Sequence, residues 1–311
     1  MSLRDSFVNA LQAVGLEDKS LVVLVGDISH SRFQSFAKGC PRRYYNVGIC
    51  ENTILSMASG LSALGFNPVV HSIAPFLIER SFEQIKLDFG YQKLGVSIIT
   101  VGSAFDYADL GCTHHCYDDF ALIKAIPGSQ MIYPVSYVEF DKLFKQTYNN
   151  GNLTVFRISH HGHNFEFDPE DIELGKGVLV KEGKDLTIIA TGSHLKTAMD
   201  SIDELEKLGI SPEIIYIHTI KPFDAELVNK SLKKTKKCLV IEEHSMYGGV
   251  FDDVLRVTKD LKNIKYTSIN IGDIFIREYG TYEQHCKRLG FSVEGIIKKV
   301  IEELNGRNKF T

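Results

Sequence analysis

The 311-residue sequence lacks a strong excess of either charge, with 35 Lys and Arg against 39 Asp and Glu and a formal net charge of −4. Such a balance gives no general electrostatic footprint for nucleic acid or for an anionic membrane surface. Residues 1–5 carry no apolar export segment, and no apolar run reaches the length that crosses a bilayer. We therefore expect a cytoplasmic protein that binds neither nucleic acid nor membrane.

The sequence also lacks a disulfide framework. Its six cysteines are scattered without a regular spacing and are expected to be free thiols in a reducing compartment: Cys40, Cys50, Cys112, Cys116, Cys238 and Cys286. Residues 112–116 offer four possible zinc ligands in five positions. So short a run does not readily turn four side chains onto one tetrahedral ion, and no second ligand pair lies at the usual spacing. We expect no metal site in this chain.

Internal repeats and low-complexity tracts are missing as well, so the chain is expected to form ordinary globular domains. Its hydrophobic fraction of 44% allows sizeable cores, and its charged fraction of 24% is typical of a globular protein. A length of 311 residues fits two domains of common size.

Short apolar runs alternate with segments of helical periodicity along the whole chain, which predicts an α/β fold. Strands are expected at 21–25, 68–72, 96–101, 130–133, 153–157, 186–190, 214–217 and 238–241. Apolar runs of this kind suit parallel strands that are buried on both faces, with helices between them. Residues 166–176 break the pattern and are the expected linker, so the predicted domains are 1–165 and 177–311, each with a largely parallel sheet flanked by helices.

The stretch 45–61 contains the most informative carboxyl group. Gly48 makes a sharp turn cheap, and the helix expected to follow places Glu51 in its first turn. In one interpretation Glu51 only complements the helix dipole. In the other, its apolar neighbours bury the carboxyl, which would raise its pKa as an acid–base catalyst near neutral pH requires.

Four motifs in order resemble the pyrimidine-binding domain of transketolases. Asn46-x-Gly48-Ile49-x-Glu51-Asn52 resembles the segment around that family's catalytic glutamate. The other three motifs are Phe76-x-x-x-Arg80-x-Phe82-Glu83-Gln84-Ile85, Gly111-Cys112-Thr113-His114 and residues 118–128. Stretches at 185–193, 221–224 and 242–249 resemble the transketolase carboxyl-terminal domain, so the resemblance covers nearly the whole chain.

The resemblance implies thiamine diphosphate as the cofactor. It assigns Glu51 to the pyrimidine nitrogen, where a carboxyl able to hold a proton promotes the cofactor's own chemistry. Phe76 matches the ring-stacking position, with Ile73 and Phe82 nearby. Without the surrounding motif, Phe76 would be read as an ordinary core residue.

Two adjacent histidines are candidates for proton transfer and substrate binding. By resemblance His114 lies beside the reacting carbon, where an imidazole shuttles protons and stabilises a developing oxyanion. A histidine in a polar loop is otherwise more often a surface residue. His115 stands where a glutamine is common in the family, and we assign it to substrate binding.

The expected acceptor pocket departs from the family pattern. Arg4 and Ser31 match positions that contact a sugar phosphate in typical transketolases. However, His160 stands where an arginine usually grips the phosphate, while Gly102 and Leu110 replace a histidine and an aspartate that contact substrate. Because arginine is a permanent bidentate clamp and histidine is not, an unphosphorylated or nucleotide-linked sugar is the expected acceptor, bound in part by His160.

The 311 residues contain no Gly-Asp-Gly…Asn motif, with which the family holds the diphosphate and its divalent cation. The chain therefore resembles the carboxyl-terminal subunit of a split transketolase. An amino-terminal subunit is expected to supply that domain and to hold Mg²⁺ or Ca²⁺, within an α2β2 heterotetramer.

We thus expect a transferase subunit that helps to move a two-carbon ketol unit from a ketose to an aldehyde. Two alternatives stay open. One is a subunit that decarboxylates a 2-oxo acid, as in dehydrogenase β subunits or deoxyxylulose phosphate synthase. The other is a non-catalytic regulatory subunit. The sequence does not name the donor, the acceptor, the pathway or the partner.

Overall fold

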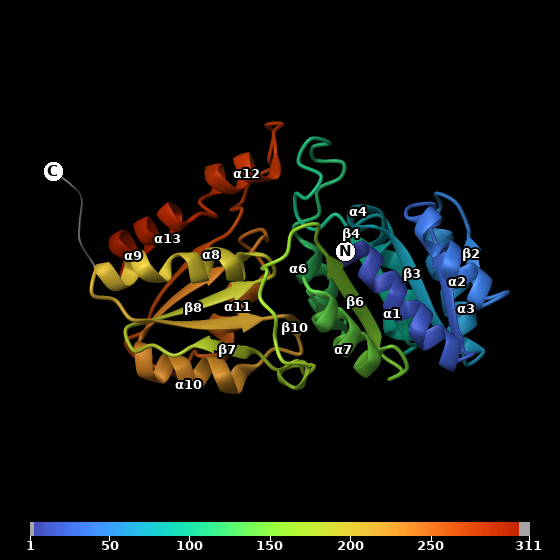
Figure 1. Ribbon diagram of the computed structural model, residues 1–311, viewed down its shortest axis with the longest axis horizontal. Helices are drawn as coiled ribbons and strands as arrows, with labels where there is room; N and C mark the ends of the chain where they lie inside the picture. Colours follow the sequence, from blue (N-terminus) through green and yellow to red (C-terminus); the bar gives the residue numbers. More distant parts are fainter. Residues whose placement is uncertain (1–2, 305–311) are drawn as a thin grey trace.

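The computed structural model describes the backbone of residues 3–304 and the side chains of residues 7–302. Two α/β units lie side by side, and each has a central sheet with helices on both faces (Figure 1). Within the described range, no helix is both long enough and apolar enough to cross a membrane.

The first unit is built on a seven-stranded sheet in the order β10-β5-β6-β4-β3-β1-β2. Its strands are β1 (Leu21–Val25), β2 (Tyr44–Asn46), β3 (Asn67–Ile73), β4 (Val96–Val101), β5 (Gln130–Ile132), β6 (Leu153–Ile158) and β10 (Thr219–Lys221). The α-helices of this unit are α1 (Leu3–Glu17), α2 (Gln34–Gly39), α3 (Glu51–Ala63), α4 (Ala74–Leu77), α5 (Phe82–Gln84), α6 (Asp119–Lys124) and α7 (Tyr137–Thr147). Shorter helical turns are η1 (His30–Phe33), the π-helix η2 (Ile85–Tyr91) and η3 (Pro169–Asp171).

The second unit has a five-stranded sheet in the order β12-β11-β8-β9-β7. Its strands are β7 (Val178–Lys181), β8 (Leu186–Thr191), β9 (Pro212–Ile217), β11 (Lys237–Ile241) and β12 (Lys265–Ile269). The helices that cover it are α8 (His194–Asp200), α9 (Ile202–Lys207), α10 (Ala225–Thr235), α11 (Val250–Val257), α12 (Tyr282–Leu289), α13 (Val293–Lys299) and the π-helix η4 (Val300–Leu304).

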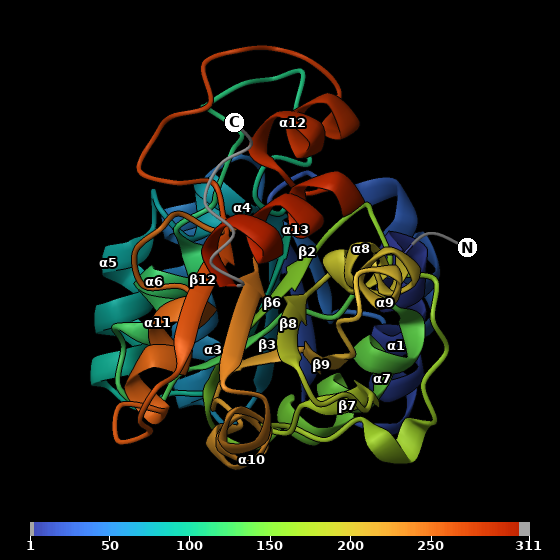
Figure 2. The same cartoon turned by 90° about the vertical axis from the view of Figure 1, so that its left-hand side faces the viewer.

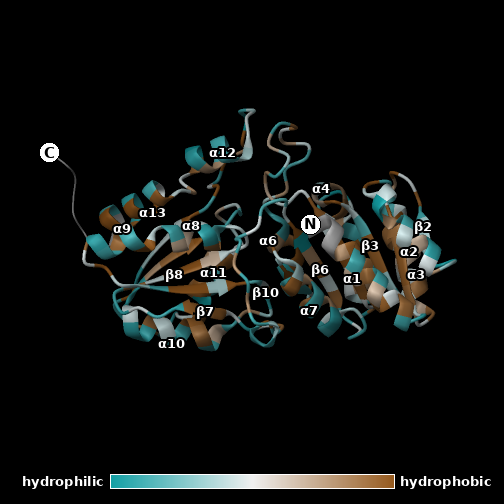
Figure 3. Cartoon of the chain, in the orientation of Figure 1, coloured by the Kyte–Doolittle hydropathy of each residue, from teal (hydrophilic) through white to brown (hydrophobic). Residues whose placement is uncertain are grey.

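The predicted α/β fold class is confirmed. Every paired strand runs parallel to its neighbour except β10 against β5 and β7 against β9, which lie at sheet edges. The strands β1, β4, β6, β8 and β9 are buried at every residue, as the apolar runs of the sequence require. In Figure 3 the hydrophobic strands lie beneath helices whose outer faces are hydrophilic.

The two sheets are not independent of each other. Strand β10 comes from the second half of the chain but pairs antiparallel with β5 of the first sheet. One continuous apolar core joins side chains from both units, whereas a second cluster lies only on the α1 and α7 side of the first sheet. The division into 1–165 and 177–311 therefore stays a prediction, and the second half contributes to both sheets.

Two helical segments are interrupted, each beside a buried serine. Residues 74–91 form α4, α5 and η2, and the Ser81 hydroxyl donates to the carbonyl of Phe76 at 3.0 Å. Residues 194–207 are divided into α8 and α9, and the Ser201 hydroxyl donates to the carbonyl of Ala198 at 2.7 Å. Serine competes with the backbone for these acceptors, which explains both interruptions.

Two loops, one from each unit, project together from one side of the molecule, at the top of Figure 2. The first follows β4 and carries residues 102–117, and the second precedes α12. They touch where a Cβ on Gly111 would lie 3.1 Å from the Tyr279 ring, and the Tyr117 hydroxyl donates to the carbonyl of Ile274 at 3.4 Å. Residues 112–116, which include His114 and His115, are therefore held between the two units.

Candidate active site

A pocket of about 420 Å³ opens at the carboxyl ends of β1 and β3. It is lined by Gly26, Asp27, Ile28, Ser29, His30, Ser31, Ile49, Glu51, Ser72, Ile73 and Phe76. Ligands of open parallel sheets bind characteristically at this edge. Four of the residues assigned from the sequence, Ser31, Glu51, Ile73 and Phe76, thus line one pocket.

Glu51 begins α3 and is only 2% exposed, although it borders the pocket. Its Oε1 accepts a hydrogen bond from the Ser72 hydroxyl at 3.0 Å, and its Oε2 lies 3.4 Å from Arg80 Nη1. The expected apolar surroundings are therefore only part of its environment, because one hydroxyl and one half-exposed guanidinium also contact the carboxylate. These contacts fix both oxygens at the wall of the pocket.

The backbone beside Glu51 is packed so closely that it requires glycine. A Cβ on Gly26 would lie 3.0 Å from Ser72 Oγ and 3.4 Å from Glu51 Oε1. The next turn is strained, since Asp27 and Ser29 have positive φ angles of 68° and 61°. Residues in such conformations persist where the surrounding structure holds them and cluster at functional sites.

Asn46 explains the spacing of the Asn46-x-Gly48 motif. Its Oδ1 accepts from the amides of Asp27 and Gly48, both at 3.1 Å. Its Nδ2 donates to Asp27 Oδ1 at 3.1 Å. One side chain therefore ties the strained turn after β1 to the turn that delivers Glu51.

Phe76 lies in α4 with its ring half-buried between two other candidate residues. The Arg80 guanidinium carbon is 4.3 Å from the ring centroid, and the His114 ring meets it edge-on at 5.4 Å. Arg80 thus contacts both the Glu51 carboxylate and the Phe76 ring. Ile73 ends β3 on the same wall, whereas Phe82 begins α5 and is not among the residues that line the pocket.

His114 lies in the loop after β4 and contacts Phe76 of the pocket wall, although it is not among the residues that line the pocket. Its ring is half-buried, contacts Phe76, and has Nδ1 3.0 Å from the Thr113 hydroxyl. The Tyr107 ring meets His114 edge-on at 5.8 Å and meets His160 at 5.4 Å. The rings of Phe76, His114, Tyr107 and His160 therefore form a continuous row that starts at the pocket.

Tyr107 also explains the glycine at position 102. Gly102 has a φ of 79°, and a Cβ there would lie 2.3 Å from the Tyr107 ring. The ring thus occupies the space into which a side chain at position 102 would project. This packing excludes a histidine at position 102 in the present arrangement.

The remaining assigned residues lie in different surroundings. His160 is exposed, and Ser31 is an exposed member of the pocket lining. His115 is buried against Tyr117 and His285, and burial, followed by the charge of His285, lowers its pKa to about 4. The side chain of Arg4 lies outside the described residues.

Asp106 connects the strand ends that carry His114 and His160. Its Oδ2 accepts from the amides of Ser103 at 3.1 Å and His160 at 2.9 Å, and its Oδ1 accepts from the Ser159 hydroxyl at 3.0 Å. Burial, reinforced by the negative charge of Glu243, raises the pKa of Asp106 to about 7. Nothing in the sequence singles out Asp106 or Ser72. The positive φ of Asp27 likewise has no signal in the neighbouring residues.

The two glycines before α11, Gly248 and Gly249, allow close packing and do not form an anion-binding site. A Cβ on Gly248 would lie 2.5 Å from that of Ala121, and one on Gly249 would collide with Glu242. The buried Glu242 carboxylate accepts from the amides of Val250 and Phe251 at the first turn of the helix, at 2.5 Å and 3.0 Å. The chain's own carboxylate thus occupies the place where an anion would bind.

Two families match the chain over most of its length. Residues 1–162 match the pyrimidine-binding domain of transketolase, and residues 175–296 match the transketolase C-terminal domain. The chain is 32% identical over 308 residues to a putative transketolase C-terminal section from Methanocaldococcus jannaschii, covering 97% of this chain and 96% of that protein. It is 29% identical over 305 residues to an apulose-4-phosphate transketolase subunit from Phocaeicola vulgatus, covering 97% of each.

A solved structure is similar over nearly all of its length. It is described as a split gene transketolase in the form of an inactive β4 tetramer. The two structures have a TM-score of 0.87 and 29% sequence identity, and the alignment covers 98% of each chain.

Proposed function

Because this chain belongs to the transketolase family, we propose that it is the carboxyl-terminal subunit of a thiamine diphosphate-dependent ketol transferase. The observation that carries the proposal is that Glu51 and Phe76 line one pocket and that the His114 ring contacts Phe76. A regulatory subunit that had lost the chemistry would have no need of all three together.

The pocket fits the pyrimidine half of the cofactor. It combines a buried carboxylate, Glu51, with apolar walls from Ile49, Ile73 and Phe76. When bound, thiamine diphosphate supplies the carbanion stabilisation that cleavage beside a carbonyl requires. The protein's part is to orient the ring, hold a proton and exclude water.

Each candidate residue has a separate role in this mechanism. Glu51 holds and returns a proton at its carboxylate, which the Ser72 hydroxyl and Arg80 keep in place. Phe76 provides the flat wall on which an aromatic ring is oriented. The imidazole of His114 moves a proton at the substrate side of the same wall, where its ring contacts Phe76.

A second polypeptide completes the site. The 311 residues contain no Gly-Asp-Gly…Asn motif, so an amino-terminal transketolase-like subunit binds the diphosphate and its Mg²⁺ or Ca²⁺. A closed two-fold α2β2 assembly is the simplest arrangement in which both halves meet. The name of the similar solved structure, an inactive tetramer of β chains, supports the requirement for the other subunit.

The acceptor is an unphosphorylated sugar or one carried on a larger group. His160 is the exposed member of the row of aromatic rings, and Tyr107 covers Gly102, so neither position offers a permanent cation to a small phosphosugar. Ser31 remains in the pocket lining as a polar contact. Arg4 is the further candidate contact from the sequence.

The decisive experiment assays the complex of this chain with the amino-terminal subunit of its own organism. Ketose donors and aldehyde acceptors are tested for two-carbon transfer, and 2-oxo acids are tested in parallel for release of CO₂. We expect ketol transfer to proceed and CO₂ release to be slow or undetectable. Efficient decarboxylation without ketol transfer would contradict the proposed reaction.

A further inference from the structure

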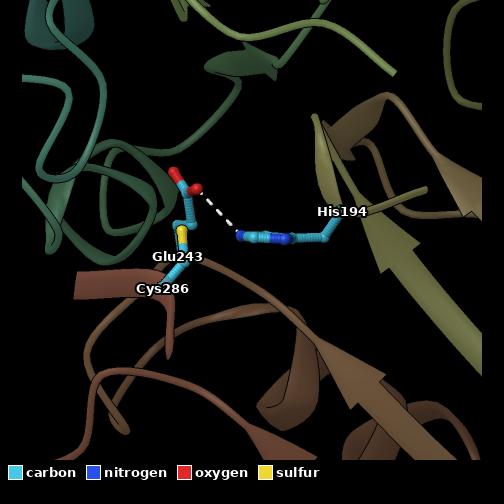
Figure 4. A group of neighbouring side chains, drawn as sticks. All are labelled: His194, Glu243 and Cys286. Atoms are coloured by element: carbon cyan, nitrogen blue, oxygen red, sulfur yellow. Dashed lines mark ion pairs between the residues drawn. The ribbon is translucent and has the colours of Figure 1, made fainter. Parts of the chain in front are cut away.

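A buried cluster in the second unit joins three side chains that are distant in the sequence. His194 begins α8, Glu243 follows β11, and Cys286 lies in α12. One ligand atom from each lies within 4.8 Å of the other two, and all three residues are buried. Figure 4 shows the imidazole facing the carboxylate, with the Cys286 sulfur beside them.

The polar atoms at the centre of this cluster are incompletely satisfied. His194 Nε2 and Glu243 Oε1 form an ion pair at 2.8 Å. Glu243 Oε2 has no hydrogen-bond partner in the described range, since Arg157 Nη2 is 3.9 Å away. A buried carboxylate oxygen without a partner needs an explanation, and a bound cation beside it is one.

The protein holds these groups firmly in place. The His194 ring stacks on Phe291 with centroids 4.5 Å apart, and its Nδ1 lies 3.4 Å from the Thr197 hydroxyl. A metal bound at Nε2 requires the tautomer that carries its proton on Nδ1, and the Thr197 hydroxyl is placed to accept from that nitrogen. The Tyr282 hydroxyl donates to Glu243 Oε1 and fixes the carboxylate from the other side.

The local charge balance favours a cation. Arg157 is fully buried and lies 3.3 Å from Asp119 as well as 3.9 Å from Glu243, so one guanidinium serves two carboxylates. Buried carboxylates are stable as ions when they are paired or coordinate a metal.

We propose that His194, Glu243 and Cys286 form a binding site for a divalent cation of the zinc class. An imidazole, a carboxylate and a thiolate are all zinc ligands, and this mixture suits zinc better than magnesium or calcium. Cys286 releases its thiol proton to solvent as the S–metal bond forms. A pocket of about 450 Å³, lined in part by His194, Tyr282 and Cys286, provides an entry path and room for a fourth ligand from solvent.

The ion would fasten α12 to the end of the second sheet. Helix α12 carries Tyr282, whose ring stacks on His161 with centroids 3.6 Å apart and nearly parallel planes. His161 is adjacent in sequence to His160, the proposed acceptor contact of the first unit. The metal therefore holds a helix of the second unit against the segment that follows β6, and it takes no part in ketol transfer.

The test titrates the full chain, freed of metal by a chelator, with Zn²⁺ and then with Co²⁺ as a spectroscopic probe. We expect one ion per chain, a thiolate-to-cobalt charge-transfer band, and a rise of a few degrees in the unfolding midpoint with excess Zn²⁺. Cys286→Ser should abolish the charge-transfer band, and His194→Gln should weaken binding at least ten-fold. Circular dichroism of both variants confirms that they remain folded.

Cys112→Ser is the matched control, because Cys112 is an exposed thiol in the other histidine- and cysteine-rich segment. This variant should bind Co²⁺ like the unmodified chain. Loss of the band in Cys112→Ser but not in Cys286→Ser would overturn the assignment. So would the absence of stoichiometric binding in the unmodified chain, which would mean that a proton alone joins His194 and Glu243.

Discussion

Replacing Glu51 with glutamine separates proton transfer from binding. In the unmodified chain the Ser72 hydroxyl donates to Glu51 at 3.0 Å. The amide oxygen of Glu51→Gln can still accept this hydrogen bond, but the amide cannot give or take a proton near neutral pH. The lost contact with Arg80 contributes at most ~1 kcal/mol to stability, because the Arg80 side chain is 51% exposed. A positioned acid–base group contributes roughly 10²–10⁴-fold to a proton-transfer step. We therefore expect exchange of the cofactor's reactive ring proton to slow at least 100-fold, while cofactor affinity changes much less.

The measurement is hydrogen–deuterium exchange of that ring proton by quenched-flow NMR, in the complex with the amino-terminal subunit. Calorimetry gives the cofactor affinity of the same samples. Glu83→Gln is the matched control, since Glu83 is an exposed glutamate of α5 that does not line the pocket. Exchange in Glu51→Gln within three-fold of the unmodified complex would refute the role of Glu51, whatever its effect on turnover.

Three further variants test the surroundings of the site. His160→Arg should shift the ratio of kcat/KM values, phosphorylated over unphosphorylated acceptor, towards small phosphosugars by ten-fold or more, because a charge-assisted hydrogen bond contributes roughly 1.5–3 kcal/mol. A hundred-fold preference for the phosphosugar in the unmodified complex would contradict our account of the acceptor. Gly26→Ala should reduce turnover of the complex with little change in the unfolding midpoint. The added Cβ lies 3.0 Å from Ser72 Oγ and displaces the hydroxyl that holds Glu51. Unchanged turnover would show that the contact between Ser72 and Glu51 is dispensable. Burial raises the pKa of Asp106 to about 7, so the folded state binds this proton more tightly than the unfolded state does. The contribution of Asp106 to the free energy of unfolding is therefore full below pH ~4 and is lost as the pH rises through 7. Asp106→Asn should flatten that decline in urea-unfolding free energies measured from pH 4.5 to 8, and an unchanged slope would exclude Asp106 as its source.

The strands at the centre of both sheets were predictable because burial on both faces leaves continuous apolar runs. Strands β1, β4 and β8 are such runs, and the structure confirms them. The edge strands β2, β7 and β12 were missed because they are partly exposed and their sequences lack that signal. Pairing of β10 with β5 depends on a contact between the two halves of the chain, which local patterns do not encode.

In the site, too, some features follow from neighbouring residues, whereas others depend on contacts between residues far apart in the sequence. The turn at Gly48 and the helix that begins at Glu51 follow from neighbouring residues, and the family resemblance directed attention to Phe76 and His114. The groups that hold Glu51 lie far along the chain, with Ser72 and Arg80 separated from it by 21 and 29 positions. Their contribution becomes visible only when β1, β3 and α3 are placed together.

The buried cluster of His194, Glu243 and Cys286 is an extreme case of this limit. Its members are separated by tens of residues and follow no ligand spacing that sequence motifs of zinc sites use. In the sequence, zinc binding came into question only at residues 112–116, because the candidate ligands there lie within five consecutive positions. In three dimensions Cys112 is exposed, whereas Cys116 is fully buried.

The central claim is that this chain carries the proton-transfer half of a site that only a second subunit completes. Calorimetric titration of thiamine diphosphate with Mg²⁺ tests it most directly, first on the isolated chain and then on its complex with the amino-terminal subunit. We predict weak or undetectable binding and no ketol transfer by the isolated chain, with tight binding and turnover in the complex, since the cofactor stabilises the assembly in which both halves meet. Tight binding of the cofactor by the isolated chain would contradict this account.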